Sequence, residues 1–290
     1  MYYYIINPSA GKGAINTIQD KLRDRLRELG IAGEFAKTTG PGEASKMATA
    51  AIEKGYNTVV AVGGDGTVNE VINGITKDNV AVGIIPIGNS NVLANHLGIH
   101  NWQQAAAVLA ARRLTSYGLI AAGSNFFLST LTLGFETDLE KRVDTVPEAK
   151  LSDKLRHFGR GYNQAQNFTP LKCLISVDDK YELECDLFTL TVANQKFLNP
   201  LADNRLIVSI SDKPSKTQTA SYMWRRLQGK QPTDDGATTR FLASRVIIRT
   251  EPPTGIMVDG KLTTRTPIAI RLTDRHIRFI TEKPQEGLQG

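Results

Sequence analysis

Five consecutive residues, Gly63-Gly64-Asp65-Gly66-Thr67, constrain the fold of this chain more than any other stretch. They follow an apolar run at residues 58–62, typical of a buried strand, and precede residues 68–75, whose apolar spacing predicts a helix. Glycines allow the backbone to approach an anion closely, and the N-terminus of a following helix adds partial positive charge. A strand, a glycine turn and a helix in this order predict a phosphate-binding site.

Asp65 stands inside this turn, where its carboxylate disfavours a bare phosphate. We therefore expect it to meet a magnesium ion or a nucleotide hydroxyl. Glycines for the phosphates and a carboxylate for the metal together predict a nucleotide-dependent kinase. An alternative stays open for its neighbours, because Thr67 and Glu70 have the spacing of a capping box and could serve only the helix start.

The length of 290 residues, 41% of them hydrophobic, predicts two domains with real cores. No apolar run approaches the roughly 18 residues that span a bilayer. The first residues lack the charged start and the cleavage site of a signal peptide. These features predict a cytoplasmic protein.

The net charge of +6 admits nucleotides, phospholipid headgroups and nucleic acid as partners. Nucleic acid is not expected, because the chain has neither a basic and aromatic stripe nor zinc-finger spacing. The only cysteines, Cys173 and Cys185, flank a predicted hairpin turn at residues 177–180. They are candidate neighbours across that hairpin, and we expect free thiols rather than a disulfide.

The first part of the chain alternates strand and helix patterns, which predicts a parallel sheet covered on both faces. The predicted strands are residues 3–6, 35–38, 58–62 and 80–85, and the predicted helices are residues 15–29, 43–54 and 68–75. We predict an α/β domain at residues 1–122, completed by a C-terminal strand within residues 276–290. The site is expected at the carboxyl ends of its strands.

Beyond residue 120 strand patterns dominate, which predicts a second, mostly antiparallel β-sandwich domain at residues 123–275. One further helix is expected at residues 217–228. The predicted strands are residues 125–133, 171–177, 181–193, 206–210, 245–249, 266–272 and 276–281.

Three loops at successive strand ends complete the pattern: Asn7-Pro8-Ser9-Ala10-Gly11-Lys12-Gly13, the glycine pentapeptide, and Pro86-Ile87-Gly88-Asn89-Ser90-Asn91. Together they resemble the catalytic domain of the diacylglycerol kinase and sphingosine kinase superfamily, especially its bacterial lipid kinases. The pentapeptide is shared with NAD kinases and phosphofructokinase-like folds, whereas the opening loop favours lipid kinases. The alternative for that opening loop is a simple glycine turn before a helix.

This resemblance implies a Rossmann-like first domain, a lipid-binding second domain, and ATP and Mg²⁺ as cofactors for phosphorylating a lipid hydroxyl of diacylglycerol type. It places Asp65 in the metal network. Asp203 matches a structural magnesium ligand of some bacterial members, although Asn204 replaces the glycine that usually follows it. An aspartate in a solvent-exposed turn explains Asp203 equally well. The nucleotide contacts that it implies are Asn7, Pro8, Gly11, Lys12, Gly63, Gly64, Gly66, Thr67, Gly88 and Asn91.

The chain departs from the family where the reaction needs a base. Lys261 stands at the position of a glutamate proposed to deprotonate the lipid hydroxyl, and a protonated lysine cannot accept a proton. Asp259 is then the candidate base. Gly118 stands where members carry an aspartate of the metal network.

Two further hypotheses therefore remain beside the lipid kinase. One is a relative that binds nucleotide or an anionic lipid without phosphoryl transfer, with Lys261 holding a phosphate. The other is a soluble-substrate kinase of the NAD kinase type.

Lipid access requires exposed apolar side chains, and the sequence offers Phe197-Leu198 and the helix at residues 217–228, with Tyr222, Met223, Trp224, Arg225 and Arg226. Aromatic residues beside arginines suit peripheral binding at the inner face of the membrane. The alternative is that this helix packs Met223 and Leu227 into the second domain. The oligomeric state is open, and a homodimer is one expectation.

Overall fold

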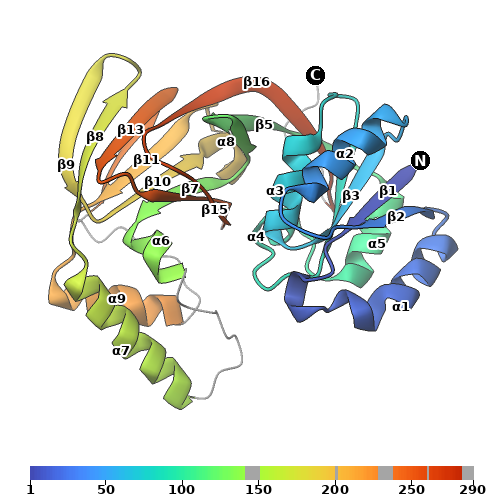
Figure 1. Ribbon diagram of the computed structural model, residues 1–290, viewed down its shortest axis with the longest axis horizontal. Coiled ribbons are helices and arrows are strands. Elements are labelled where there is room, and N and C mark those ends of the chain that lie inside the picture. Colours follow the sequence, from blue (N-terminus) through green and yellow to red (C-terminus); the bar gives the residue numbers. More distant parts are fainter. Residues whose placement is uncertain (141–150, 200–201, 228–237, 260, 283–290) are drawn as a thin grey trace.

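The computed structural model describes residues 1–140, 151–199, 202–227, 238–259 and 261–282, and it contains two β-sheets flanked by helices (Figure 1). The larger sheet has the strand order β2-β1-β3-β4-β16-β13-β8-β9, with β5 pairing β16 and β6 pairing β5. The smaller sheet has the order β12-β11-β10-β7-β14-β15 and is antiparallel throughout. The mixed α/β fold expected from the sequence is confirmed.

The N-terminal part is a parallel α/β unit. β3 and β4 are buried at every residue, as expected for parallel strands that helices cover on both faces. Its strands are β1 (Tyr2–Ile6), β2 (Gly33–Lys37), β3 (Thr58–Gly63) and β4 (Ala81–Pro86). Its helices are the 3-10 turn η1 (Ala10–Lys12), α1 (Ile15–Glu28), α2 (Glu43–Glu53), α3 (Asp65–Gly74), α4 (Val92–His96) and α5 (Trp102–Ala111).

The remaining strands form a two-layer sandwich, in which one layer continues the larger sheet. These continuing strands are β5 (Leu114–Ala122), β6 (Asn125–Phe127), β8 (Leu171–Val177), β9 (Tyr181–Leu187), β13 (Arg245–Glu251) and β16 (Ile268–Ile280). The facing layer consists of β7 (Thr130–Gly134), β10 (Thr189–Asn194), β11 (Leu206–Ser211), β12 (Thr238–Ala243), β14 (Gly255–Val258) and β15 (Lys261–Arg265). One buried core joins the layers, with Ile175 and Val246 from one and Leu190 and Val208 from the other.

Helices α7 (Leu151–Asn167) and α9 (Lys216–Leu227) lie side by side beyond the sandwich (Figure 1). A separate aromatic core joins them to α6 (Phe135–Glu140), with Phe135, Phe188 and Met223 at its centre. The short helix α8 (Gln195–Leu198) follows β10. The predicted helix at residues 217–228 is thus confirmed as α9, of which residue 228 lies outside the described residues.

β16 links the two parts of the molecule. Near its beginning it pairs with β13, from Ile268 to Arg271, and near its end it pairs in parallel with β4, at Arg278 and Phe279. Along most of its length it also pairs with β5. The chain therefore returns to the N-terminal sheet where a C-terminal strand was expected, whereas residues 283–290 lie outside the described part. The domain boundaries themselves stay a prediction.

Four of the predicted strands were wrong in their extent. The segment 125–133 is divided between β6 and β7, and the segment 181–193 between β9 and β10, which belong to different sheets. The segments 266–272 and 276–281, by contrast, belong to one strand. The polar residues 273–275 between them do not end the strand but form an irregularity where the register with β5 shifts.

Candidate functional site

The three glycine-containing loops meet at the carboxyl ends of β1, β3 and β4. Gly11 has a positive φ of 56°, and a Cβ atom there would overlap the carbonyl oxygen of Ile87. A Cβ atom on Gly88 would lie 2.5 Å from Cα of Gly64. Because the first and third loops, and the second and third, touch through their backbones, these positions require glycine. The convergence expected from the sequence is present in the structure.

A side-chain hydrogen bond ties the first loop to the second. Nδ2 of Asn7 donates to Oγ1 of Thr67 at 3.0 Å, and Oδ1 of Asn7 accepts from the backbone N–H of Ser9 at 3.0 Å. Thr67 is only 4% exposed. Asn7 therefore orients the hydroxyl of Thr67 from the end of the neighbouring strand.

The capping-box interpretation of Thr67 and Glu70 was wrong. The residue that caps α3 is Gly64, so Thr67 lies inside the first turn. Oε2 of Glu70 instead accepts from the backbone N–H of Ala44 at 3.3 Å, near the start of α2. Thr67 thus has no capping role and faces Asn7.

Asp65 is the first residue of α3 and makes a contact that the sequence did not predict. Its Oδ1 accepts the backbone N–H of Leu93, in the first turn of α4, at 3.0 Å. Its Oδ2 accepts no hydrogen bond from the residues that the structure describes. Asp65 is half-buried, so one carboxylate oxygen fixes the third loop and the other remains available at the N-terminus of α3.

The third loop is held by its own asparagine. Oδ1 of Asn91 accepts from the N–H of Gly88 at 3.0 Å, and its Nδ2 donates to the carbonyl of Gly88 at 2.8 Å. Asn91 has a positive φ of 47°, which asparagine tolerates better than most residues. Pro8 lies half-buried and Lys12 exposed in the first loop. The nucleotide contacts assigned to these residues stay predictions.

Asp259 lies at the junction of α3 with the second sheet and is strongly hydrogen-bonded. Its Oδ1 accepts from the hydroxyl and the N–H of Ser129, at 2.6 and 3.1 Å, and from the N–H of Thr130, at 3.1 Å. Its Oδ2 accepts from Nδ2 of Asn69 at 3.1 Å and from the N–H of Leu128 at 3.3 Å. Both oxygens of this carboxylate therefore accept hydrogen bonds from groups of the surrounding fold.

Asn69 brings the two candidate acids to one side of α3. It lies four residues after Asp65, and residues at this spacing share a helix face. One turn further, Asn73 accepts from the N–H of Phe126 at 2.7 Å and donates to its carbonyl at 2.9 Å. The helix that opens the predicted phosphate site is thus attached along its length to the second part of the molecule.

The two departures from the family pattern lie on strands next to this region. Lys261 begins β15, where it pairs with Val258, and the structure describes its backbone only. Gly118 lies on β5 opposite His276, and a Cβ atom there would stand 3.7 Å from Nε2 of that histidine, an ordinary contact. A cavity of about 40 Å³ opens beside it, lined by Ser116, Tyr117, Gly118, Asn194, Phe197, Asn204 and His276.

Asp203 is exposed, and its carbonyl accepts from the N–H of Arg205 at 2.9 Å. In the described part of the chain, no three His, Cys, Asp or Glu side chains come together as a metal site. The metal role of Asp203 stays a prediction.

The candidate residues for lipid access divide into buried and exposed ones. Phe197 is 3% exposed and stacks on His96 with a centroid distance of 4.0 Å, whereas Leu198 is 50% exposed. In α9, Met223 is 3% exposed and Trp224 is 52% exposed. The alternative in which Met223 packs into the second domain is confirmed, and the side chains of Arg226 and Leu227 lie outside the described residues. Leu198 and Trp224 remain as the surface candidates.

Comparison with known proteins identifies the family. Residues 1–146, half of the chain, match the model of the diacylglycerol kinase catalytic domain. The chain belongs to this family. The resemblance inferred from the three loops is confirmed, and the diacylglycerol kinase family supports a lipid kinase-like function.

The matches to relatives in this family cover nearly the whole chain. A diacylglycerol kinase of Bacillus subtilis (strain 168) is 24% identical over 291 residues, which covers 96% of this chain and 95% of that protein. One from Staphylococcus epidermidis (strain ATCC 12228) is 23% identical and covers 96% and 91%. A crystal structure of a diacylglycerol kinase from Bacillus anthracis str. Sterne has a TM-score of 0.69 at 20% identity, covering 97% and 96%, and shows the same fold. Within the described residues, no helix is both long and apolar enough to cross a membrane.

Proposed function

We propose that this chain is an ATP-dependent lipid kinase that transfers the γ-phosphoryl group to a lipid hydroxyl of diacylglycerol type. The observation that carries the proposal is the meeting of three glycine loops at the N-terminus of α3, with Asp65 as its first residue. The family membership supports a kinase, and this geometry supports a nucleotide as the phosphoryl donor.

The loops provide the elements that bind phosphates. The first backbone N–H groups of a helix lack partners within the helix and point outward, where they favour an anion. Gly63 and Gly64 precede this end of α3, where a Cβ atom would meet Thr67 and Gly88, so the loops pack closely around it, and Asn7 orients the hydroxyl of Thr67 beside it. In phosphoryl transfer such positioning supplies most of the catalysis.

Asp65 is the residue that would hold magnesium. Mg²⁺ is commonly bound by one or two carboxylates together with phosphate oxygens and waters, so a single carboxylate with a free oxygen fits this ion. When bound with ATP, Mg²⁺ neutralises the charge that develops on the transferred group. Asp65 keeps Oδ2 available while Leu93 fixes its orientation through Oδ1.

Asp259 fits a positioning role better than the role of general base. A base needs a lone pair directed at the proton it removes, and five donor contacts already surround this carboxylate. We assign it the task of holding α3 against the sandwich, so that the three glycine loops, which bind the nucleotide, keep a fixed position relative to the lipid-binding part. Because Lys261 replaces the expected base, we expect a slow kinase.

The second candidate is a protein that binds nucleotide or an anionic lipid without transferring a phosphoryl group. It is favoured by Gly118 and Lys261, which remove two carboxylates that the family pattern places at the reaction centre. A soluble-substrate kinase is the third candidate, and the opening loop argues against it.

Phosphoryl transfer from labelled ATP with magnesium decides among these candidates. The acceptors are diacylglycerol, phosphatidylglycerol, undecaprenol, a sphingoid base and, as a soluble acceptor, NAD. Asp65→Asn keeps an oxygen that accepts from Leu93 but loses the charge, and it should reduce the rate roughly 10²- to 10³-fold. Asp20→Asn is the matched control, since Asp20 is exposed on α1 and belongs to no candidate site.

Each outcome identifies one candidate. A labelled lipid that depends on Asp65 supports the proposal, and labelled NAD supports the soluble-substrate kinase. If no acceptor is labelled while ATP still binds, the proposal is rejected in favour of the nucleotide-binding protein.

A further inference from the structure

The two cysteines lie directly opposite each other in the β8–β9 hairpin. Cys173 of β8 pairs in register with Cys185 of β9, as expected from the sequence, and both thiols are free. Residues directly opposite in an antiparallel pair have Cα atoms about 4.5 to 5.5 Å apart, a separation that a disulfide can span. A bond between these two sulfur atoms requires no change of strand register.

We propose that Cys173 and Cys185 form a site of reversible oxidation, at which hydrogen peroxide closes a disulfide across the hairpin. The chain has no other cysteine, so every disulfide within one molecule must join this pair. The site is independent of the kinase function, because β8 and β9 carry none of the residues assigned to nucleotide or metal.

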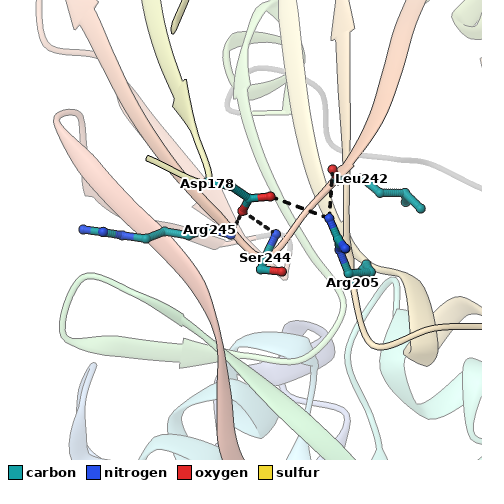
Figure 2. Close-up of polar contacts among 5 residues, drawn as sticks. All are labelled: Asp178, Arg205, Leu242, Ser244 and Arg245. Atoms are coloured by element: carbon teal, nitrogen blue, oxygen red, sulfur yellow. Dashed lines mark hydrogen bonds and ion pairs between the residues drawn. The ribbon is translucent and has the colours of Figure 1, made fainter. Parts of the chain in front are cut away.

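The turn of the hairpin is fixed, which keeps the pair in register. Oδ1 of Asp178 accepts the backbone N–H groups of Ser244 and Arg245, each at 2.8 Å (Figure 2). Its Oδ2 lies 3.6 Å from Nη2 of Arg205, which precedes β11 in the facing sheet (Figure 2). Asp178 therefore attaches the turn of the hairpin to both layers of the sandwich, and the continuous β8–β9 pairing sets Cys185 opposite Cys173.

The environments of the two thiols differ and determine which one reacts first. Cys173 is buried at 4% exposure, whereas Cys185 is half-buried on the edge strand of the sheet. The hydrogen bond from Cys173 lowers the pKa of Cys185, against the opposing effects of burial and of Asp212 and Asp186. The same hydrogen bond, with burial, raises the pKa of Cys173. Cys185 is thus the more accessible sulfur and the one favoured as thiolate.

The reaction proceeds in two balanced steps. The Cys185 thiolate attacks one oxygen of hydrogen peroxide, so that an S–O bond forms, the O–O bond breaks, and the departing hydroxide takes a proton to become water. Cys173 then attacks the sulfur of the resulting sulfenic acid, the S–S bond forms, and the second oxygen leaves as water with the proton of Cys173. The two thiols lose two electrons, which reduce the peroxide.

The experiment uses the full chain, first reduced and then treated with hydrogen peroxide. After unfolding and alkylation with iodoacetamide, the oxidised protein should carry no alkylated cysteine, and dithiothreitol should restore both. The disulfide restricts the unfolded chain, so the oxidised form should melt roughly 5 °C above the reduced form. Two alkylated cysteines after peroxide, or disulfides only between chains, would overturn the proposal.

Two serine variants and an unfolded control test the geometry. Cys173→Ser should leave a sulfenic acid on Cys185 that dimedone traps, and Cys185→Ser should leave Cys173 unreacted at the same peroxide dose. The wild-type disulfide should form at least tenfold faster in the folded protein than in urea, because the pair is pre-aligned. Equal rates in the two states would mean that the fold contributes nothing, which would reject the site.

Discussion

Asn69 donates its side-chain N–H to the carboxylate of Asp259 at 3.1 Å, across 190 residues of sequence. The same carboxylate accepts three consecutive backbone N–H groups, those of Leu128, Ser129 and Thr130. One side chain thus connects the helix of the nucleotide loops, the connection between β6 and β7, and the end of β14. Its charge stabilises the junction of the two parts of the molecule.

Asp259→Asn should destabilise the protein by about 2 to 4 kcal/mol. The substitution keeps the volume but removes the charge, and it directs an NH₂ group toward donors that then lack an acceptor. Urea unfolding measures the loss, with Asp20→Asn on the exposed face of α1 as a control that should change stability by less than about 0.5 kcal/mol. If Asp259→Asn were as stable as wild type yet inactive, Asp259 would be a base rather than a positioning residue.

This junction also explains why one strand prediction failed. The side chains of residues 125–133 predict a single strand. The backbone N–H groups of Leu128, Ser129 and Thr130 instead donate to Asp259, so the strand does not continue from β6 into β7. The partner that breaks the strand lies about 130 residues away, so no local pattern contains it. The parallel strands and their helices, by contrast, follow from local periodicity and were predictable.

Gly88→Ala should weaken nucleotide binding roughly tenfold, equivalent to about 1.4 kcal/mol. The added methyl group would lie 2.5 Å from Cα of Gly64, so the second and third loops must separate. Gly40→Ala is the matched control, since a Cβ atom there meets nothing within 4 Å. Calorimetric titration with ATP measures both variants. Equal affinities would show that the contact between these loops does not shape the nucleotide site.

Asn7 and Thr67 should be energetically coupled in nucleotide binding. Their hydrogen bond of 3.0 Å joins the first two loops, and a typical hydrogen bond contributes about 0.5 to 1.5 kcal/mol. A double-mutant cycle with Asn7→Ala and Thr67→Val, read as the dissociation constant for ATP, should give a coupling energy in that range. Additive effects would mean that the two side chains bind ATP independently or not at all.

Restoring the two carboxylates of the family pattern should accelerate phosphoryl transfer. A Cβ atom at position 118 would lie 3.7 Å from His276, an ordinary contact, so Gly118→Asp adds no clash at Cβ. Lys261→Glu supplies a carboxylate that can act as the base. The double variant should gain roughly 10²-fold over wild type with labelled ATP and diacylglycerol. Lys180→Glu, which changes the same charge in an exposed turn, should have no effect. An unchanged rate in a folded double variant would place the limiting step elsewhere.

Trp224→Ala should reduce binding to vesicles that contain phosphatidylglycerol several-fold. Trp224 is 52% exposed on α9, and an exposed indole on a basic protein suits the headgroup region of an anionic membrane. Tyr181→Ala removes a side chain that is 71% exposed on β9 and serves as the control. Cosedimentation with vesicles measures both. Equal loss in the two variants would argue against docking through α9.

The site was predictable in its composition but not in its internal contacts. The loop glycines and Asp65 were identified because chemistry restricts which residues can stand in a phosphate turn. The hydrogen bonds from Leu93 to Asp65 and from Ala44 to Glu70 were not predictable. Each joins two segments that are distant in the sequence, and no local residue pattern indicates that they meet. Asn69, which local reasoning overlooked, showed no signal beyond its position one turn after Asp65.

β16 gives the molecule an unusual mechanical property. Its 13 residues extend from the sandwich into the parallel sheet without a break, so both parts share one continuous ribbon of backbone. Residues 273–275 interrupt the pairing with β5, but they lie inside the strand, so β16 contains no long loop that could act as a free hinge along this path. An approach of the sandwich toward the glycine loops would therefore have to twist β16 and β5, and that twist would return the molecule to its resting shape when the ligands leave.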